Sequence, residues 1–365
     1  MRVLHVINAF TGGGAEKLLH DTVITQKKKG VDVEVCLLSQ KNNHYLDAVK
    51  SKGIQVHISR YESLYSPGHI KELKKIINQG NYDIVHVHLF PSLYWGAFAK
   101  LLTNKHINFV YTEHSTHNRR RDKPYLKLIE NFIYRQYARI FCISDGTEEN
   151  LHEWISNTMK KTKVVPNGIN LQNYTHADPY KKKDLFPGAE ENDKLIVMIA
   201  RFTQQKDHET LIRSLKYLDD IYKVLLVGDG ERLEYIKKLT ISEGVSDRVQ
   251  FLGFRKDIPQ ILKTSDIFVL SSHWEGFGLV AAEAMASGLP VLVSDVEGLR
   301  DVVDCPDLTF PQGDSERLAE KIKNTLENTD ISNEFIAYGL YRVRNFSIES
   351  MVESLINEYR RIINN

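Results

Sequence analysis

Two glutamates in the second half of the chain, Glu275 and Glu283, are separated by seven residues. Their segment is predicted to pass from a strand through a glycine loop into a helix that starts near Gly278. Helical geometry then places Glu283 about one and a half turns into that helix. A ligand at the helix start would meet both carboxylates, and the N–H groups of Phe277, Gly278 and Leu279 would face its anionic part.

The neighbours of Glu283 argue against an ordinary surface charge. An isolated pair of glutamates is usually a solvated feature of a helix. The residues that flank Glu283 are small enough for close packing, namely Ala281, Ala282, Ala284 and Ala286. We therefore expect that Glu283 is not merely a solubilising charge.

Two cations, Arg201 and Lys206, come directly after a strand predicted over residues 194–200. Ligands of open α/β sheets bind beyond the carboxyl ends of the strands, which is where these cations fall. Arginine grips two oxygens in a fork and lysine supplies a compact charge, so the pair suits a pyrophosphate. The alternative is that both are solvated surface cations, the usual state of Lys and Arg.

A glycine cluster, residues 12–14, lies between a strand predicted over 3–8 and a helix predicted over 16–28. Glycines let the backbone approach a ligand closely, and a helix start offers N–H groups to an anion. The spacing is not the Gly-x-Gly-x-x-Gly of dinucleotide-binding proteins, which argues against a nicotinamide-dependent oxidoreductase. A plain strand-to-helix turn is the alternative.

Histidine is concentrated in the first half of the chain, where 12 of the 14 histidines precede residue 181. His114 follows the predicted strand that ends at Thr112, so it falls at the carboxyl edge of a sheet. His86, His88 and His117 are close competitors, and a histidine taken at random more often serves packing or the surface.

These residues must be positioned by a regular pattern of elements. Short β-branched runs alternate with stretches of helical period, which predicts parallel sheets with crossover helices. Strands are predicted over residues 3–8, 31–38, 83–87, 109–112, 140–144, 194–200, 223–227, 267–270 and 290–293, and helices over 16–28, 69–78, 93–102, 125–137, 208–216 and 231–242. The alternation lapses near residues 164–170, so we predict two doubly wound domains, 1–170 and 171–345, with a final helix over 346–365 that packs back on the first.

Composition excludes several classes of protein. The 365 residues carry 48 Lys and Arg against 47 Asp and Glu, a net charge of +1, which argues against a polybasic nucleic-acid binder. Cys36, Cys142 and Cys305 are odd in number and far apart, so they predict neither a disulfide framework nor a metal knuckle. No stretch reaches the roughly 18 uninterrupted apolar residues of a membrane-spanning helix. We expect a cytoplasmic protein.

Taken together, the segments resemble the retaining glycosyltransferases of family 4. The resemblance follows the chain in order through 12–16, 112–115, 166–169, 201–206, 227–230 and the Glu-x(7)-Glu segment that starts at Glu275. It implies the α/β GT-B fold, in which two Rossmann-like domains face each other across a cleft. It also implies a sugar-nucleotide donor held by the second domain and an acceptor that enters over the first.

The resemblance assigns roles in donor binding. Arg201 and Lys206 would hold the diphosphate, Glu283 the ribose hydroxyls, and the backbone of Arg255 would face the base. Glu275 and the N–H groups of Phe277, Gly278 and Leu279 would meet the donor sugar and phosphates. Gly13 and Gly14 would approach the diphosphate from the first domain, and His114 would lie beside the transferred sugar.

The implied reaction is transfer with retention of anomeric configuration, from a donor that is expected to be a UDP-sugar, with a GDP-sugar as the alternative. The acceptor would be a saccharide or a lipid-linked saccharide of a bacterial-type surface glycan. Neither a metal nor a cofactor is expected, because no convincing Asp-x-Asp site is present and the family does not require one. The rival interpretations are a sugar-nucleotide epimerase of the same two-domain shape and a non-catalytic sugar-nucleotide-binding partner.

The net charge of +1 conceals an asymmetry. Residues 1–180 hold 24 Lys and Arg against 16 Asp and Glu, whereas the rest of the chain holds 24 against 31. The basic residues of the first part cluster at 27–29, 119–127 and 160–163. They predict either ordinary solvated charge or a basic face that docks on the anionic inner leaflet of a cell membrane.

Overall fold

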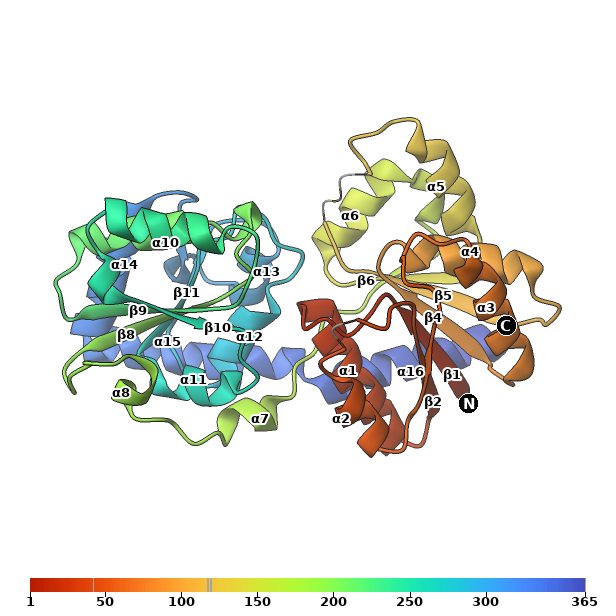
Figure 1. Cartoon of the computed structure of the whole chain (residues 1–365), viewed down its shortest axis with the longest axis horizontal. Helices are drawn as coiled ribbons and strands as arrows, with labels where there is room; N and C mark the ends of the chain where they lie inside the picture. Colours follow the sequence, from red (N-terminus) through yellow and green to blue (C-terminus); the bar gives the residue numbers. More distant parts are fainter. Residues whose placement is uncertain (42, 117, 119, 365) are drawn as a thin grey trace. The chain divides into compact units, whose positions relative to one another are not determined.

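The computed structural model describes residues 1–41, 43–116, 118 and 120–364, which divide into two compact units (Figure 1). Unit 1 comprises Met1–Ile169 and the chain from Ile348 onward, and unit 2 comprises Asn170–Ser347. The predicted boundaries, at 170/171 and 345/346, lie within two residues of these. Each unit is an α/β domain built on its own parallel sheet, so the predicted class of two Rossmann-like doubly wound domains is confirmed.

Unit 1 is built on a parallel sheet. Its described strands are β1 (Arg2–Ile7), β2 (Asp32–Leu37), β3 (Gln55–Ile58), β4 (Ile84–His88), β5 (Asn108–Glu113), β6 (Arg139–Cys142) and β7 (Thr162–Val164). They are arranged in the order β3-β2-β1-β4-β5-β6-β7. The order reverses at β1, so the loops after β1 and β4 leave the sheet at the switch point where doubly wound folds bind ligands.

Helices cover both faces of this sheet (Figure 1). They are α1 (Gly14–Lys28), α2 (Leu46–Ser51), α3 (Gly68–Gln79), α4 (Ser92–Leu102), α5 (Leu126–Arg135), α6 (Asp145–Trp154) and α16 (Ile348–Asn364). The helix α16 packs beside α1, although all of unit 2 separates the two in sequence. At the start of α16 the N–H of Ile348 donates to the carbonyl of Ile169 at 2.9 Å.

Unit 2 repeats the design with a second parallel sheet. Its described strands are β8 (Lys194–Ile199), β9 (Tyr222–Val227), β10 (Val249–Gly253), β11 (Ile267–Leu270), β12 (Val291–Ser294) and β13 (Thr309–Phe310), in the order β10-β9-β8-β11-β12-β13. The helices are α7 (Leu171–Thr175), α8 (Lys182–Leu185), α9 (His208–Ser214), α10 (Leu233–Ser242), α11 (Ile258–Thr264), α12 (Leu279–Ala286), α13 (Leu299–Val303), α14 (Ser315–Glu327) and α15 (Thr329–Arg342). The order reverses at β8, so the loops after β8 and β11 mark the corresponding switch point.

The central strands form where the sequence is continuously apolar. Residues 195–198 and 267–270 are fully buried, as expected for strands covered by helices on both faces. Four strands, β3, β7, β10 and β13, lie outside the ranges predicted from sequence. All four are edge strands with partly exposed side chains, so their sequences lack the apolar run that marks a central strand.

Across the described residues, none of the helices combines the length and apolar character needed to cross a membrane.

Candidate functional site

The two charged segments predicted from sequence meet at the carboxyl edge of the unit 2 sheet. The strands β8 and β11 are parallel neighbours, so the loops that follow them leave the sheet side by side. Lys206 ends the loop after β8, and its Nζ is hydrogen-bonded to Oε1 of Glu275 in the loop after β11. The same oxygen accepts a 3.1 Å hydrogen bond from the hydroxyl of Ser272. The side chains of Lys206 and Glu275 are only 19% and 9% exposed, so the ion pair is largely withdrawn from water.

Further hydrogen bonds tie the two loops together. The side-chain amide of Gln205 donates to the carbonyl of Trp274 at 2.8 Å, and the N–H of His273 donates to the carbonyl of Gln205 at 2.7 Å. The hydroxyl of Ser271 donates to the carbonyl of Asp207 at 2.6 Å. These bonds fix the lysine and the glutamate in one geometry before any ligand binds, which reduces the entropy that binding would cost.

A buried turn directly follows Lys206 in the chain and leads into α9. Asp207 adopts a left-handed backbone conformation with φ of 45° and caps α9 by accepting from the N–H of Thr210. Burial raises the pKa of the Asp207 carboxyl. His208 stacks on Phe202 with ring centroids 4.3 Å apart, and burial together with the charge of Lys206 lowers its pKa to about 3. His208 is therefore neutral at physiological pH.

Glycines allow the loops of this edge to pack backbone against backbone. A Cβ atom on Gly228 would lie 2.0 Å from the carbonyl oxygen of Ala200, and one on Gly298 would lie 2.5 Å from that of Glu275. Both glycines have a positive φ, of 144° and 79°. No side chain fits at either position without displacing the loop that it touches.

The helix α12 begins where the sequence predicted, with Gly278 as its N-cap at φ 81°. Phe277 and the alanines of α12 are buried, and Glu283 is only 6% exposed in the second turn. The carboxylate of Glu283 is thus not a solvated helix charge. Leu279 is the first residue of the helix, so its N–H and that of Gly278 belong to the helix start, where the helix dipole favours an anion.

The two remaining predicted residues of unit 2 lie in different settings. Arg201 is exposed in the loop after β8, and within the described residues its guanidinium has neither an ion pair nor a hydrogen bond. Arg255 follows β10, two strands away from β8, and its guanidinium is paired with Asp257. Arg201 is therefore available to a ligand, whereas Arg255 has only its backbone to offer, which is the part assigned to it by the family resemblance.

In unit 1, His114 lies at the carboxyl edge of the sheet, directly after β5. It is partly exposed, and its Nε2 lies 3.2 Å from Nδ1 of His88. Desolvation lowers the pKa of His114 to about 4, so the ring is neutral at physiological pH. His114 lines a pocket together with residues of α1, β4, β5 and α16, among them Ala15, Thr112 and Met351.

The glycine cluster opens α1 on the same side of unit 1. Gly13 is the N-cap and Gly14 the first residue of the helix, and Gly12 adopts a φ of 96°. No side chain caps this helix start within the described residues. The carboxylate of Glu16 in the first turn accepts a 3.1 Å hydrogen bond from the hydroxyl of Thr11. The helix start is therefore a place for an acidic group, as expected from its dipole.

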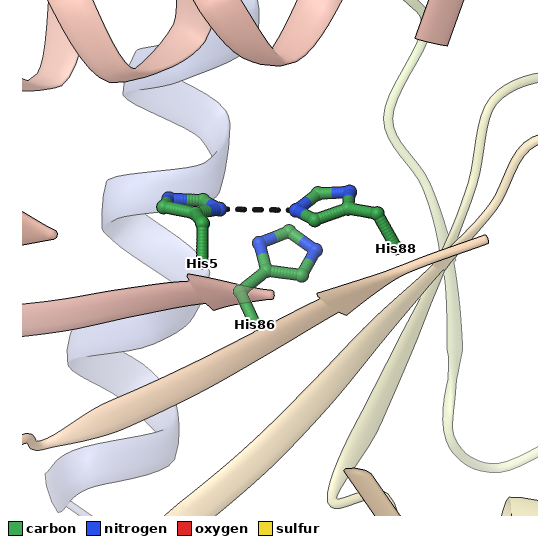
Figure 2. Close-up of side chains that lie close together, drawn as sticks. All are labelled: His5, His86 and His88. Carbon is green, nitrogen blue, oxygen red and sulfur yellow. Dashed lines mark hydrogen bonds between the residues drawn. The ribbon is translucent and has the colours of Figure 1, made fainter. Parts of the chain in front are cut away.

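A cluster of buried histidines beside His114 was not predicted. His5 on β1 is the register partner of His86 on β4, and His88 follows two residues later on the same face (Figure 2). The spacing of His86 and His88 was a signal that both face one side of a strand. The sequence does not reveal that β1 is the neighbouring strand, and His117, the third competitor, lies outside the described residues.

Comparison with known proteins identifies the class. The structure of Anabaena Alr3699/HepE in complex with UDP-glucose superposes with a TM-score of 0.86 at 20% identity, over 99% of this chain and 100% of that chain. Sucrose-phosphate synthase from Thermosynechococcus elongatus gives a TM-score of 0.84 at 20% identity, with both chains fully covered. The fold is thus the GT-B fold of glycosyltransferases.

Family models match the two units separately. The model of Glycosyltransferase Family 4 matches residues 12–173, and that of Glycosyl transferases group 1 matches residues 181–341. Because the two models together account for most of both units, the chain belongs to the family-4 type of GT-B glycosyltransferases.

Two curated relatives match part of the chain at 27% and 30% identity. The chain is 30% identical over 239 residues to the Escherichia coli UDP-Gal:alpha-D-GlcNAc-diphosphoundecaprenol alpha-1,3-galactosyltransferase, a match to 62% of this chain. It is 27% identical to the Bacillus anthracis N-acetyl-alpha-D-glucosaminyl L-malate synthase, over 76% of this chain and 75% of that enzyme. The match spans 61% of the length of the Escherichia coli enzyme and of MJ1607, an uncharacterized glycosyltransferase of Methanocaldococcus jannaschii.

Proposed function

We propose that the protein is a retaining glycosyltransferase that moves a sugar from a UDP-sugar to a saccharide or lipid-linked saccharide in surface glycan synthesis. The observation that carries this proposal is the largely buried Lys206–Glu275 pair, at the same sheet edge as the start of α12 and as Arg201, whose guanidinium has no ion pair within the described residues. A lysine, an arginine and helix N–H groups at one sheet edge form a preorganised site for a diphosphate. The relatives named above that use UDP-galactose or bind UDP-glucose support the choice of donor.

The charges of this site suit the chemistry of the bond that breaks. Cleavage of the anomeric C–O bond leaves negative charge on the nucleoside diphosphate and gives the sugar oxocarbenium character. Lys206 and Arg201 would stabilise the leaving diphosphate, and Glu283 would hold the ribose hydroxyls. The departing phosphate would take the proton of the acceptor hydroxyl, and the oxygen of that hydroxyl would form its bond to the anomeric carbon on the face that the phosphate leaves. The anomeric configuration would then be retained.

The same cations support catalysis without a divalent metal. Lys206 and Arg201 provide the positive charge that Mg²⁺ supplies to diphosphates in other enzymes. We expect activity to persist after treatment with EDTA. A complete loss of turnover that added Mg²⁺ or Mn²⁺ restores would contradict this part of the proposal.

A panel of nucleotide sugars tests the proposal as a whole. Thermal shift and release of the nucleoside diphosphate are measured with UDP- and GDP-sugars, each with and without undecaprenyl-diphosphate-linked saccharides. We expect a UDP-sugar to stabilise the protein and to be consumed with acceptor, and NMR of the product to show a retained anomeric configuration. Conversion of the donor alone to another sugar would instead establish an epimerase. Binding without turnover across the panel would establish a non-catalytic partner.

A lipid-linked acceptor requires access to a membrane, and α5 has a surface suited to it. Tyr125, Leu128, Ile129 and Phe132 have the spacing of one helix face and are between 45% and 79% exposed. The opposite face is fixed by buried Glu130, which accepts hydrogen bonds from the side chains of Tyr94, Arg120 and Trp154. The anchored face leaves the apolar stripe directed toward solvent.

Basic residues lie beside this stripe, and the structure refines which of them are exposed. Lys123, Lys127 and Arg135 are exposed on or next to α5. Arg120 and Arg121 are turned inward instead, where they pair with Glu130 and Glu113. Arg119 lies outside the described residues. We propose that the stripe inserts into the interface of an anionic membrane while the exposed cations meet its headgroups.

Flotation with vesicles of phosphatidylglycerol and phosphatidylcholine tests this surface. Leu128→Ser combined with Phe132→Ser should lower the bound fraction tenfold or more, since each buried apolar side chain contributes roughly 1.5–3 kcal/mol. The control is Ile241→Ser in unit 2, which replaces an exposed apolar side chain (69%) that is not part of the stripe. Absence of binding by the unmodified protein at low salt would leave the basic residues as ordinary solvated charge.

A further inference from the structure

A chain of hydrogen bonds leads from the core of unit 1 to His114. The Oε1 atom of buried Gln26 on α1 lies 2.8 Å from Nε2 of His5, and Nδ1 of His5 lies 3.0 Å from Nε2 of His88. Nδ1 of His88 in turn lies 3.2 Å from Nε2 of His114. Figure 2 shows the first two rings meeting edge to edge through their nitrogens. His5 and His88 thus each direct one ring nitrogen toward the preceding residue of the chain and the other toward the following one.

All three rings are neutral at physiological pH. Desolvation lowers the pKa of His5 and His114 to about 4, and that of His88 lies well below its ordinary value because of burial and the neighbouring histidines. A neutral imidazole carries one N–H donor and one lone-pair acceptor. Fixing the role of one nitrogen therefore fixes the role of the other.

With the amide oxygen of Gln26 directed toward His5, as in this structure, the donor and acceptor roles along the chain follow. An oxygen only accepts, so Nε2 of His5 carries the proton and Nδ1 of His5 accepts from Nε2–H of His88. His88 then accepts at Nδ1 from Nε2–H of His114. The outer nitrogen of His114, Nδ1, is left as an acceptor, and within the described residues it has no hydrogen bond.

We propose that Gln26, His5 and His88 are positioning residues that hold His114 with its proton on Nε2 and its Nδ1 as a hydrogen-bond acceptor for the donor sugar. The inference rests on the proposed function for the identity of the ligand. A ligand group that donates a hydrogen bond, such as a sugar hydroxyl, matches this tautomer. A carbonyl or phosphate oxygen does not match it.

A metal ion is the rival occupant of this cluster, because ligand atoms of His5, His86 and His88 lie within 4.8 Å of one another. The hydrogen bonds disfavour it. Both nitrogens of His86 are already engaged, Nε2 with the hydroxyl of Thr112 at 2.7 Å and Nδ1 with the phenol of Tyr359. No Asp or Glu belongs to the cluster among the described residues, so a buried dication would lack a compensating charge.

Nitrogen-15 NMR of histidine side chains in the ligand-free protein tests the tautomers directly. We expect His5, His88 and His114 all in the Nε2–H form at pH 7. The opposite form of His114, with its proton on Nδ1, would overturn the proposal, because it requires the amide group of Gln26 to donate to His5 and the whole chain to be reversed. Stoichiometric zinc in the purified protein, measured by mass spectrometry, would overturn it as well.

A substitution at the inner end of the chain separates positioning from packing. Gln26→Met keeps the size of the side chain but removes the acceptor, so His114 should show a mixture of tautomers and turnover should fall about tenfold, the effect of losing one hydrogen bond. The control is His69→Gln, which alters a buried histidine of unit 1 bonded to Ser59 and Ser63. His69→Gln should leave the tautomer of His114 unchanged.

The two readouts fail independently. A protein that transfers no sugar but shows His5, His88 and His114 in the Nε2–H form would support the hydrogen-bond chain and contradict the proposed function. If Gln26→Met does not fold, the spectrum of the unmodified protein still decides between the two tautomers. An unchanged His114 tautomer in folded Gln26→Met would show that the inner residues do not control it.

Discussion

The two units hold different kinds of polar group at the same place in the fold. At the carboxyl edge of its sheet, unit 2 holds an ion pair, Lys206 with Glu275. At the same edge, unit 1 holds neutral histidines, His88 and His114. The compositions agree with this division: unit 1 has 11 of the 14 histidines, with 26 Lys and Arg against 18 Asp and Glu, whereas unit 2 has 22 against 29.

The difference indicates a division of labour between the units. A fixed charge pair is suited to a ligand that is itself charged at every physiological pH, such as a diphosphate. Neutral rings with defined donors and acceptors are suited to uncharged hydroxyl groups, for which a full charge would cost desolvation without a gain. One fold, used twice, thus provides two kinds of recognition through the residues at its loop ends.

Acid should distinguish the units most strongly. The pKa of His5 is about 4 in the folded protein against an ordinary value of 6.5, so below pH 6.5 the unfolded chain binds more protons than the folded one. Stability is therefore fully present above pH 6.5 and is lost as the pH falls toward 4. For His5 alone the loss approaches about 3 kcal/mol. His86 and His88, whose pKa values are also lowered, add to this loss of stability in unit 1. Among the described residues of unit 2, only His208 has a lowered histidine pKa.

Tryptophan fluorescence during urea unfolding measures this difference. Trp274→Phe leaves Trp95 and Trp154 as reporters of unit 1, and Trp95→Phe with Trp154→Phe leaves Trp274 as the reporter of unit 2. Between pH 7 and pH 4.5 the unfolding midpoint should fall further for unit 1. Equal shifts of the two midpoints would contradict the expectation that unit 1 loses more stability in acid than unit 2.

Removal of the Lys206 side chain should abolish most of the activity of the site in unit 2. Lys206→Ala should lower kcat/KM a hundredfold or more, since a lost donor to developing charge costs roughly 3 kcal/mol. Lys237→Ala, which removes an exposed lysine paired with Glu234, is the matched control and should be active. A folded and fully active Lys206→Ala protein would refute the assignment of this lysine to the diphosphate.

The predicted effect of Glu283→Ala is on binding rather than on folding. The affinity for the free nucleoside diphosphate should fall on the order of tenfold, the effect of losing a charged hydrogen bond to a ribose. Isothermal titration with UDP measures it. An unchanged Kd would mean that the buried carboxylate has a structural role only.

The smallest effect is expected from a pair of glycine substitutions. Gly298→Ala and Gly288→Ala both place an alanine at a left-handed φ, of 79° and 75°, which costs about 1–2 kcal/mol each. Only at Gly298 does the new Cβ meet the backbone of Glu275, whereas nothing lies within 4 Å at Gly288. Both variants should melt earlier, Gly298→Ala by more because of its added backbone clash, and only Gly298→Ala should also lose a few-fold in activity.

How far the sequence predicts the site differs between the two units. The residues of unit 2 lie in two short segments, 201–206 and 275–283, each in the loop that follows a strongly apolar strand, so each could be placed at the carboxyl edge of the sheet from the sequence. That the two loops meet depends on β11 lying beside β8, which the sequence does not show. The hydrogen-bond chain of unit 1 contains Gln26, His5 and His88. These residues come from a helix and two strands that are adjacent only because β4 lies beside β1. No local pattern carries that information.

The helix α16 has a consequence for the order in which the chain folds as it is made. Its Tyr359 is fully buried in unit 1 and contacts His86, yet the helix leaves the ribosome only after the whole of unit 2. Unit 2 has all of its strands by then, because its chain is continuous. The domain that is translated first is thus completed last, and His86 lacks its contact with Tyr359 until the final turns of α16 emerge.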